Sequence, residues 1–269
     1  MAFYIVKPWY RKSSGPTYQG IWVPKTWSGL TSFNGQYIWT DGTDIYYSSG
    51  TNQYVLDKAT STWSAKTWSG LSYPSGNNIW TDGTNIYYSY RSQQYVLDKA
   101  TSTWTAKTWS GLTSFDGQYI WTDGTDIYYS YFNAPFDSMQ YVLNKSTSTW
   151  TTKTWSGLTQ FNGPYIWTDG TSIYYSSNAE QYVLNKSTST WSTKTWTGSL
   201  RQPSGDKVWT DGTDIYHSNG SGYQYVLNKS TSTWTAKTWQ NLKDFYGSSI
   251  WKDGDHIYYS SGSTQYELT

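Results

Sequence analysis

Cysteine is absent from this 269-residue chain, and histidine and glutamate each occur only twice. Without cysteine there are no disulfides, no thiolate metal ligands and no thiol nucleophile. No metal-ligand spacing surrounds His217 or His256, so we expect no metal site. Glu180 and Glu267 offer few carboxylate pairs for acid–base chemistry. Because the sequence also lacks a phosphate-binding loop and a nucleophile elbow, we expect no cofactor and no enzymatic activity.

Charge is also scarce. Charged residues make up 14% of the chain and the net charge is +1, so we expect no nucleic-acid partner. No apolar run approaches the ~18 residues of a membrane span. The first apolar segment ends at Lys7, which is too early for the core of a signal peptide. We therefore expect a soluble protein of the cytoplasm or of a virion.

Aromatic residues are abundant at 20% of the chain, with 19 Trp and 28 Tyr. A buried large side chain contributes roughly 1.5–3 kcal/mol, so these residues can form a core despite the low aliphatic content. An Ile-Trp-Thr-Asp-Gly element recurs six times, with Val or Lys replacing one residue in two copies. Its tryptophans, at steps of 41, 41, 46, 42 and 42 residues, are Trp39, Trp80, Trp121, Trp167, Trp209 and Trp251. A period of about 40 residues indicates a repeated supersecondary unit.

Two further sets of tryptophans follow the same period, and we expect at least two of the three sets to fill the core between blades rather than a site. One set is Trp22, Trp63, Trp104, Trp150, Trp191 and Trp234. The other is Trp27, Trp68, Trp109, Trp155, Trp196 and Trp239.

Each repeat is expected to form four short strands, because segments rich in aromatic and β-branched residues alternate with Gly, Asp, Asn and Ser. In the first repeat we predict strand A at 37–40, strand B at 45–48, strand C at 53–56 and strand D at 62–66. Asp41-Gly42 predicts a tight A–B hairpin. No segment has a 3.6-residue apolar period, so we expect almost no helix.

The two ends of the repeat array complement each other. Residues 21–27 align with 62–68 and so correspond to a strand D, whereas the last repeat stops after its strand C at 265–268. Pairing these segments would close the array into a ring without an open sheet edge. We predict an all-β fold: a six-bladed β-propeller of four-stranded antiparallel blades, ring-closed by an N-terminal outer strand that completes the C-terminal blade. The domain would span 21–269, with 1–20 as an N-terminal extension.

The repeats resemble the kelch family of β-propellers. Asp-Gly-Thr-Asp-Ile-Tyr-Tyr at 41–47 is similar to the kelch segment that leads into the second strand of a blade. Tyr-Val-Leu-Asp-Lys-Ala-Thr-Ser-Thr-Trp at 54–63 is similar to the kelch tyrosine, turn and tryptophan. The resemblance covers 21–269 and implies propeller blades. The kelch double glycine after the second strand is replaced, for example by Ser48-Ser49.

The connections divide into two kinds. The A–B and C–D turns are nearly identical in all copies, whereas the B–C and D–A loops vary in sequence and length. In an up-and-down blade these two kinds emerge on opposite sides, so we expect a uniform side and a variable side. Loops on a rigid scaffold commonly carry recognition, and aromatic residues and arginine are favoured contact residues. The candidate partner-binding residues are Phe33, Tyr73, Arg91, Phe115, Tyr131, Phe132, Phe136, Phe161, Arg201, Tyr223, Phe245 and Tyr246.

Several repeated residues have structural interpretations. Drift in unconstrained loops is the alternative explanation of the variable side. The glycine kept in every D–A loop, such as Gly35, is expected to meet a backbone requirement. The repeated Asp41 is expected to stabilise its turn rather than bind a cation. The outer-strand lysines, expected to be solvated charges that discourage edge pairing, are Lys25, Lys66, Lys107, Lys153, Lys194 and Lys237.

These observations favour a non-catalytic binding module that presents its B–C and D–A loops to a protein or a glycan. The composition resembles that of virion-associated proteins such as phage fibre or tail components. The alternative is a structural or assembly component, or an engineered repeat scaffold, that docks through the uniform side.

Overall fold

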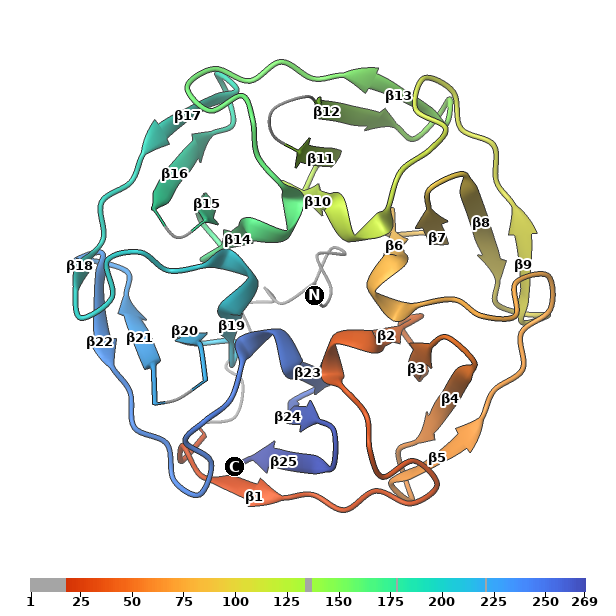
Figure 1. Cartoon of the computed structure of the whole chain (residues 1–269), viewed down its shortest axis with the longest axis horizontal. Helices are drawn as coiled ribbons and strands as arrows, with labels where there is room; N and C mark the ends of the chain where they lie inside the picture. The colour runs from red at the N-terminus through yellow and green to blue at the C-terminus, as the bar shows by residue number, and fades with distance from the viewer. Residues whose placement is uncertain (1–17, 134–136, 178, 221) are drawn as a thin grey trace. The chain divides into compact units, whose positions relative to one another are not determined.

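A computed structural model describes residues 18–133, 137–177, 179–220 and 222–269. The fold is an all-β, six-bladed β-propeller with antiparallel blades (Figure 1). The described chain divides into two compact units. The first unit contains 37–164 and 186–190, and the second contains 18–36, 165–185 and 191–269, apart from the undescribed positions within them. None of the helices in the described part of the chain has the length and apolar character needed to span a bilayer.

The first unit holds blades 1 to 3. Blade 1 consists of β2 (Ile38–Thr40), β3 (Ile45–Ser49), β4 (Asn52–Asp57) and β5 (Thr62–Ala65). Blade 2 consists of β6 (Ile79–Thr81), β7 (Ile86–Tyr90), β8 (Gln93–Asp98) and β9 (Thr103–Ala106). Blade 3 consists of β10 (Ile120–Thr122), β11 (Ile127–Asn133), β12 (Asp137–Asn144) and β13 (Thr149–Thr152).

The second unit holds blades 4 to 6. Blade 4 consists of β14 (Ile166–Thr168), β15 (Ile173–Ser177), β16 (Glu180–Asn185) and β17 (Thr190–Thr193). Blade 5 consists of β19 (Val208–Thr210), β20 (Ile215–Ser218), β21 (Gln224–Asn228) and β22 (Thr233–Ala236), joined by β18 (Thr197–Gly198). Blade 6 consists of β23 (Ile250–Asp253), β24 (His256–Ser261), β25 (Thr264–Leu268) and β1 (Trp22–Pro24).

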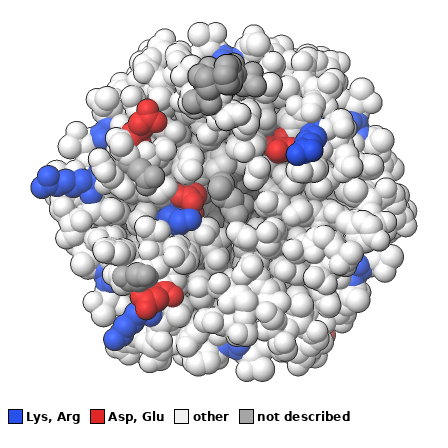
Figure 2. All heavy atoms as spheres, viewed as in Figure 1, with Lys and Arg blue, Asp and Glu red and all other residues white. Residues whose placement is uncertain are grey.

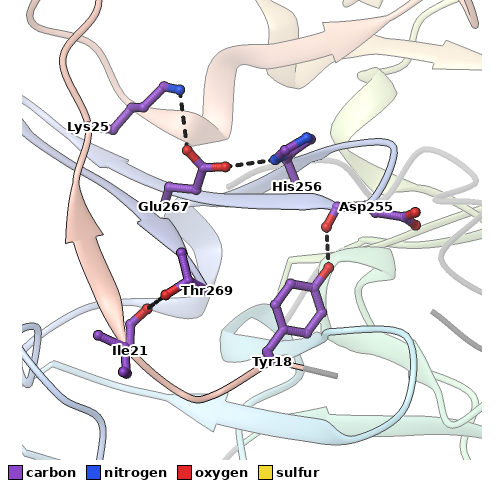
Figure 3. A network of polar contacts seen from close by, with 7 residues as sticks. All are labelled: Tyr18, Ile21, Lys25, Asp255, His256, Glu267 and Thr269. Atoms are coloured by element: carbon purple, nitrogen blue, oxygen red, sulfur yellow. Dashed lines mark hydrogen bonds and ion pairs between the residues drawn. The ribbon is translucent and has the colours of Figure 1, made fainter. Parts of the chain in front are cut away.

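The predicted ring closure is confirmed, because β1 forms the outer strand of blade 6 (Figure 1). It runs antiparallel to β25, with Trp22 opposite Leu268 and Pro24 opposite Tyr266. Glu267 on β25 lies between the side chains of Lys25 and His256 (Figure 3). Its carboxylate is 3.2 Å from Lys25 Nζ and 2.7 Å from His256 Nδ1.

The polar network at this closure differs from that of the other blades. Glu267 occupies the position that is valine in the other copies, such as Val55. Tyr18 donates its hydroxyl hydrogen to the carbonyl of Asp255, and Thr269 Oγ1 lies 3.2 Å from the carbonyl oxygen of Ile21 (Figure 3). The closing strand is therefore held by side chains as well as by its backbone ladder.

Each blade is preceded by a one-turn 3₁₀ helix that the sequence analysis did not anticipate. The six are η1 (Gly35–Tyr37), η2 (Gly76–Asn78), η3 (Gly117–Tyr119), η4 (Gly163–Tyr165), η5 (Gly205–Lys207) and η6 (Gly247–Ser249). A Cβ at Gly76 would lie 2.2 Å from the carbonyl oxygen of Tyr37. The glycine kept in the D–A loops therefore meets a backbone requirement, as predicted.

Tryptophan forms the core, as predicted, and all three six-member sets are buried. In blade 1 the Trp39 ring stacks on Tyr46 with centroids 4.4 Å apart, and its Nε1 donates to Ser48 Oγ at 2.9 Å. The same indole-to-serine hydrogen bond occurs in every blade at 2.8–2.9 Å. The polar atom of this large ring is thus satisfied inside the core.

The outer-strand lysines are not the solvated edge charges that we expected. Lys66 Nζ donates to Ser102 Oγ of the next blade at 2.7 Å and lies 4.8 Å from the centroid of the Trp68 ring. Equivalent lysine-to-serine bonds are made by Lys107, Lys153 and Lys194. Lys25 binds Glu267 instead, and Lys237 lies over the Trp239 ring.

The outer edge of the sheet is covered by the chain itself. The segment that leaves each of several blades runs parallel to the outer strand of the next one, as at Ser69 beside Thr103. Blade 5 carries the most regular example, since β18 pairs in parallel with β22. Because this segment already covers the outer edge, the lysines are not needed to protect it and instead bridge neighbouring blades. The prediction that they are solvated charges that discourage edge pairing was therefore wrong.

The aspartates of the A–B turns have the structural role that we expected. Asp41 Oδ1 accepts hydrogen bonds from the backbone N–H groups of Thr43 and Asp44 at 2.9 and 2.8 Å. Its other oxygen is 3.2 Å from the Tyr46 hydroxyl, and Lys99 donates to its carbonyl at 2.6 Å. The turn therefore uses these polar groups within the protein.

Buried tyrosines predict alkaline instability. Burial raises the pKa of the Tyr88 and Tyr175 phenols to about 12. Because the native state favours the neutral phenol, this stabilisation is complete below pH 10 and is lost as pH rises from 10 toward 12. We expect phenolate absorbance to show a late step that coincides with loss of near-ultraviolet circular dichroism. Tyr175→Phe should remove one phenol from that step; ionisation of all tyrosines near pH 10 in a fully native protein would contradict the prediction.

Candidate functional site

Each blade has a buried glutamine in its third strand. Its side chain binds the D–A loop that follows the blade, and in blade 1 it also binds the B–C loop of the same blade. In blade 1, Gln53 Nε2 donates to the carbonyl of Pro74 at 2.9 Å and to that of Gly50 at 2.6 Å. The equivalent D–A bonds are made by Gln94, Gln140, Gln181, Gln224 and Gln265. The two variable loops of a blade are therefore held together on one side of it.

Four of the twelve candidate contact residues are buried rather than exposed. These are Phe33, Phe115, Phe161 and Phe245, whose side chains are at most 2% exposed. Phe115, for example, packs against Trp150 with centroids 5.3 Å apart, while its carbonyl accepts the hydrogen bond from Gln94. The D–A loop folds these rings under itself, so they are core residues.

The other candidates differ in exposure. Tyr73, Tyr223 and Tyr246 are 63%, 59% and 47% exposed, and Arg91 and Arg201 are also exposed. Tyr131 and Phe132 are half-buried, and Phe136 lies outside the described residues.

Two of the exposed tyrosines lie on neighbouring loops of blade 5. Asn219 pairs with Tyr246 across the B–C and D–A loops, and the N–H of Gly220 donates to the carbonyl of Phe245 at 2.9 Å. Tyr223 follows in the same B–C loop, where its N–H donates to the Gly220 carbonyl at 2.9 Å. A Cβ at Gly220 would lie 2.8 Å from the Tyr246 hydroxyl oxygen, so the Tyr246 ring packs directly on this glycine. The structure thus holds an exposed aromatic pair on fixed backbone.

Polar residues beside this pair were missed by the sequence analysis. His217 on β20 occupies the position that is tyrosine in the other copies, such as Tyr129, and is 3% exposed. Its Nε2 accepts a hydrogen bond from the backbone N–H of Ser204 at 3.2 Å. The preceding loop ends at η5, where Asp206 and Lys207 form an ion pair of 2.7 Å.

Ser204, Asp206 and Lys207 connect His217 to the exposed surface formed by Tyr223 and Tyr246, which we call the tyrosine surface. Ser204 Oγ donates to Asp206 Oδ1 at 2.5 Å, and Lys207 Nζ lies 5.6 Å from the centroid of the Tyr246 ring. Comparing the copies position by position, inside the strands as well as in the loops, would have found His217 and Lys207. Both replace residues that are aromatic in most other copies.

His217 is held in its neutral form by its surroundings. Burial lowers the pKa of this imidazole to about 4, an effect that Asp206 opposes and Lys207 reinforces. Because Nε2 is the acceptor for the Ser204 N–H, the proton of the neutral ring is on Nδ1. That nitrogen is buried and has no hydrogen-bond partner among the described residues.

The surface in Figure 2 is formed mostly by uncharged residues. Charged side chains are scattered over it, and several acidic groups lie next to a basic one. Within the described ranges, no three His, Cys, Asp or Glu side chains gather in a way that could hold a metal ion.

No protein-family model and no curated protein matches the sequence, so the kelch resemblance is not confirmed. Solved structures do match the fold. An auxiliary nutrient binding protein from Bacteroides ovatus is 14% identical with a TM-score of 0.55, over 94% of this chain and 77% of that one. The extracellular domain of a hybrid two-component system from B. thetaiotaomicron is 12% identical with a TM-score of 0.53, over 86% of this chain. This chain spans 33%, about a third, of that protein. At these identities the likeness concerns the fold.

One comparison corrects the expectation that the protein is not an enzyme. A gluconolactonase from Xanthomonas campestris is 12% identical with a TM-score of 0.50, over 84% of this chain and 81% of that one. A propeller of this kind therefore supports catalysis in at least one protein. The scarcity of histidine and glutamate was too weak a reason to exclude enzymatic activity, because a fold can host unrelated functions.

Proposed function

We propose that the protein is a binding module that presents the B–C and D–A loops of its blades to a protein or glycan partner. The observation that carries this proposal is the exposed pair Tyr223 and Tyr246 on backbone fixed by hydrogen bonds. Tyrosine gives a large contact area at low entropic cost, and a loop that is already ordered loses little freedom on binding.

Finer features of this function are also proposals. Stacking of a tyrosine face on the C–H surface of a sugar would make the partner a glycan, whereas insertion of the ring into a pocket would make it a protein. We further propose a kelch-like relationship, a single propeller domain over 21–269 with an extension at 1–20, and a place in the cytoplasm or a virion such as a phage fibre or tail.

Docking through the uniform side has less support. Its repeated polar groups are already used within the protein, as at Asp41 and Lys99. Near-identity of those turns therefore has an internal explanation, namely that each turn must bond to itself and to the next blade.

The test is partner binding by a double variant, Tyr223→Ala with Tyr246→Ala. Once a glycan array or a pull-down has supplied a partner, we expect the variant to bind roughly 10- to 100-fold more weakly by calorimetry, because exposed tyrosines of this kind contribute about 1–3 kcal/mol together. Thr43→Ala, on an A–B turn, is the matched control and should bind normally. Wild-type affinity in the double variant, or no partner in either screen, would contradict the proposal.

A further inference from the structure

A continuous set of contacts joins one buried imidazole to the exposed tyrosine surface. His217 accepts the N–H of Ser204, and the Ser204 hydroxyl donates to Asp206. Asp206 pairs with Lys207, whose ammonium lies over the Tyr246 ring. Every step is a direct contact within one compact unit, so a change at the imidazole can reach the surface through at most three neighbours.

Comparison with blade 3 shows what is particular about this arrangement. There Tyr129 stands in the position of His217, and Asp116 is the counterpart of Ser204, whose backbone N–H bonds to the ring at this position in blade 5. A phenol oxygen accepts that hydrogen bond at any pH below its own ionisation. An imidazole Nε2 accepts it only while the ring is neutral, because protonation turns the acceptor into a donor.

The surroundings of His217 determine what protonation would cost. Asp206 and Lys207 on η5 are the charged groups that act on it, and the rings of Tyr225 on β21 and Trp234 on β22 pack near it. A cation placed here would face the Ser204 N–H, donor against donor, in a site that is 3% exposed. Its one available counter-charge is Asp206, which already binds Lys207 and Ser204.

We propose that His217 is a positioning residue for the Tyr246 surface: while neutral it holds the loop at Ser204, and when protonated it releases that loop and weakens binding. The proposal rests on the proposed binding function for its consequence, but the release itself is a property of the free protein. In acid the protonated His217 ring attracts the carboxylate of Asp206. This attraction weakens the ion pair between Asp206 and Lys207, so the ammonium of Lys207 is no longer held in place over the Tyr246 ring. Binding through this surface is therefore lost in acid and recovered on neutralisation.

The experiment is a pH titration of the free protein by nuclear magnetic resonance. The Ser204 amide signal, the His217 ring signals and the ¹⁹F signal of 3-fluorotyrosine placed at position 246 are followed together. We expect these three signals to follow one common single-proton transition centred near pH 4. A Ser204 amide that does not move with the His217 ring would overturn the proposal. So would a position-246 signal that stays constant through the transition.

Two variants separate positioning from mere folding. His217→Tyr restores the residue of the other copies, and His217→Gln offers a side-chain carbonyl acceptor that does not titrate. Both should keep the neutral-pH position of the Ser204 signal and lose the acid transition. His256→Asp, which matches three of the other five copies, removes the only other histidine and should leave the transition intact. If the transition persists in both His217 variants, another group causes it and the proposal fails.

The last part of the test measures partner affinity at different pH values. With a partner in hand, wild-type affinity should fall about twofold between pH 7 and pH 4 and about tenfold by pH 3, because the apparent affinity follows the neutral fraction of His217. The affinity of His217→Tyr should change much less. Equal acid sensitivity of the two proteins would refute the proposed effect on binding. If no partner is found, the proposed function fails, while the ligand-free titration still decides whether His217 positions this loop.

Discussion

Trp22→Ala should lower the free energy of unfolding by about 3–5 kcal/mol, the usual cost of truncating a fully buried tryptophan. The Trp22 side chain is 0% exposed and its ring packs 5.2 Å from Phe245 and 5.9 Å from Trp239. It lies on β1, the three-residue strand that completes blade 6, and its indole fills the interior between β1 and blade 5. Urea unfolding followed by tryptophan fluorescence measures the change.

A control for this result lies on the same strand. Val23 is 42% exposed, so Val23→Ala should change the free energy of unfolding by less than about 1 kcal/mol. If the two variants are equally stable, burial of Trp22 adds nothing to the free energy of unfolding. The pairing of β1 with blade 6 would then contribute little to the stability of the protein.

Gly111→Ala is expected to cost about 2–6 kcal/mol, from backbone strain and overpacking together. Gly111 has φ +82°, and a Cβ there would lie 1.9 Å from the carbonyl oxygen of Trp150. The neighbouring Ser110 forms the parallel bridge to Thr149 that covers the outer edge of blade 3. An alanine must therefore push the covering segment away from that edge. Denaturant unfolding again gives the free energy.

Gly124 separates the two contributions. It has φ +94°, close to that of Gly111, but nothing lies within 4 Å of its Cβ position. Gly124→Ala should therefore cost only the backbone term, roughly 1–2 kcal/mol. Equal losses in the two variants would mean that the close approach at Trp150 contributes nothing.

Much of the fold could be predicted because the sequence repeats it. The spacing of Trp39 and its counterparts gave the number of blades, and the alignment of residues 21–27 with 62–68 gave the closing strand. Both features are encoded locally, in short segments whose composition and order can be compared directly.

Other features depend on contacts between distant residues, which composition does not reveal. Phe115 resembles an exposed loop residue until Gln94, 21 positions earlier, is found to hold its carbonyl in the interior. Lys66 resembles an edge charge until the next blade supplies Ser102. His217 was considered only as a metal ligand, because the comparison of copies stopped at the loops. A residue that departs from its counterparts inside a strand was the stronger signal.

The salt-bridged carboxylate on blade 6 bears on how the chain finds its correct partner during folding. With six near-identical sheets in one molecule, an outer strand released early can dock onto the wrong one. On blade 6, Lys25 pairs with the carboxylate of Glu267. On any other blade the equivalent residue is a valine, which cannot form this ion pair. A strand docked on another blade would lose this ion pair. Glu267, with His256 beside it, thus favours pairing of β1 with blade 6 over pairing with any other blade.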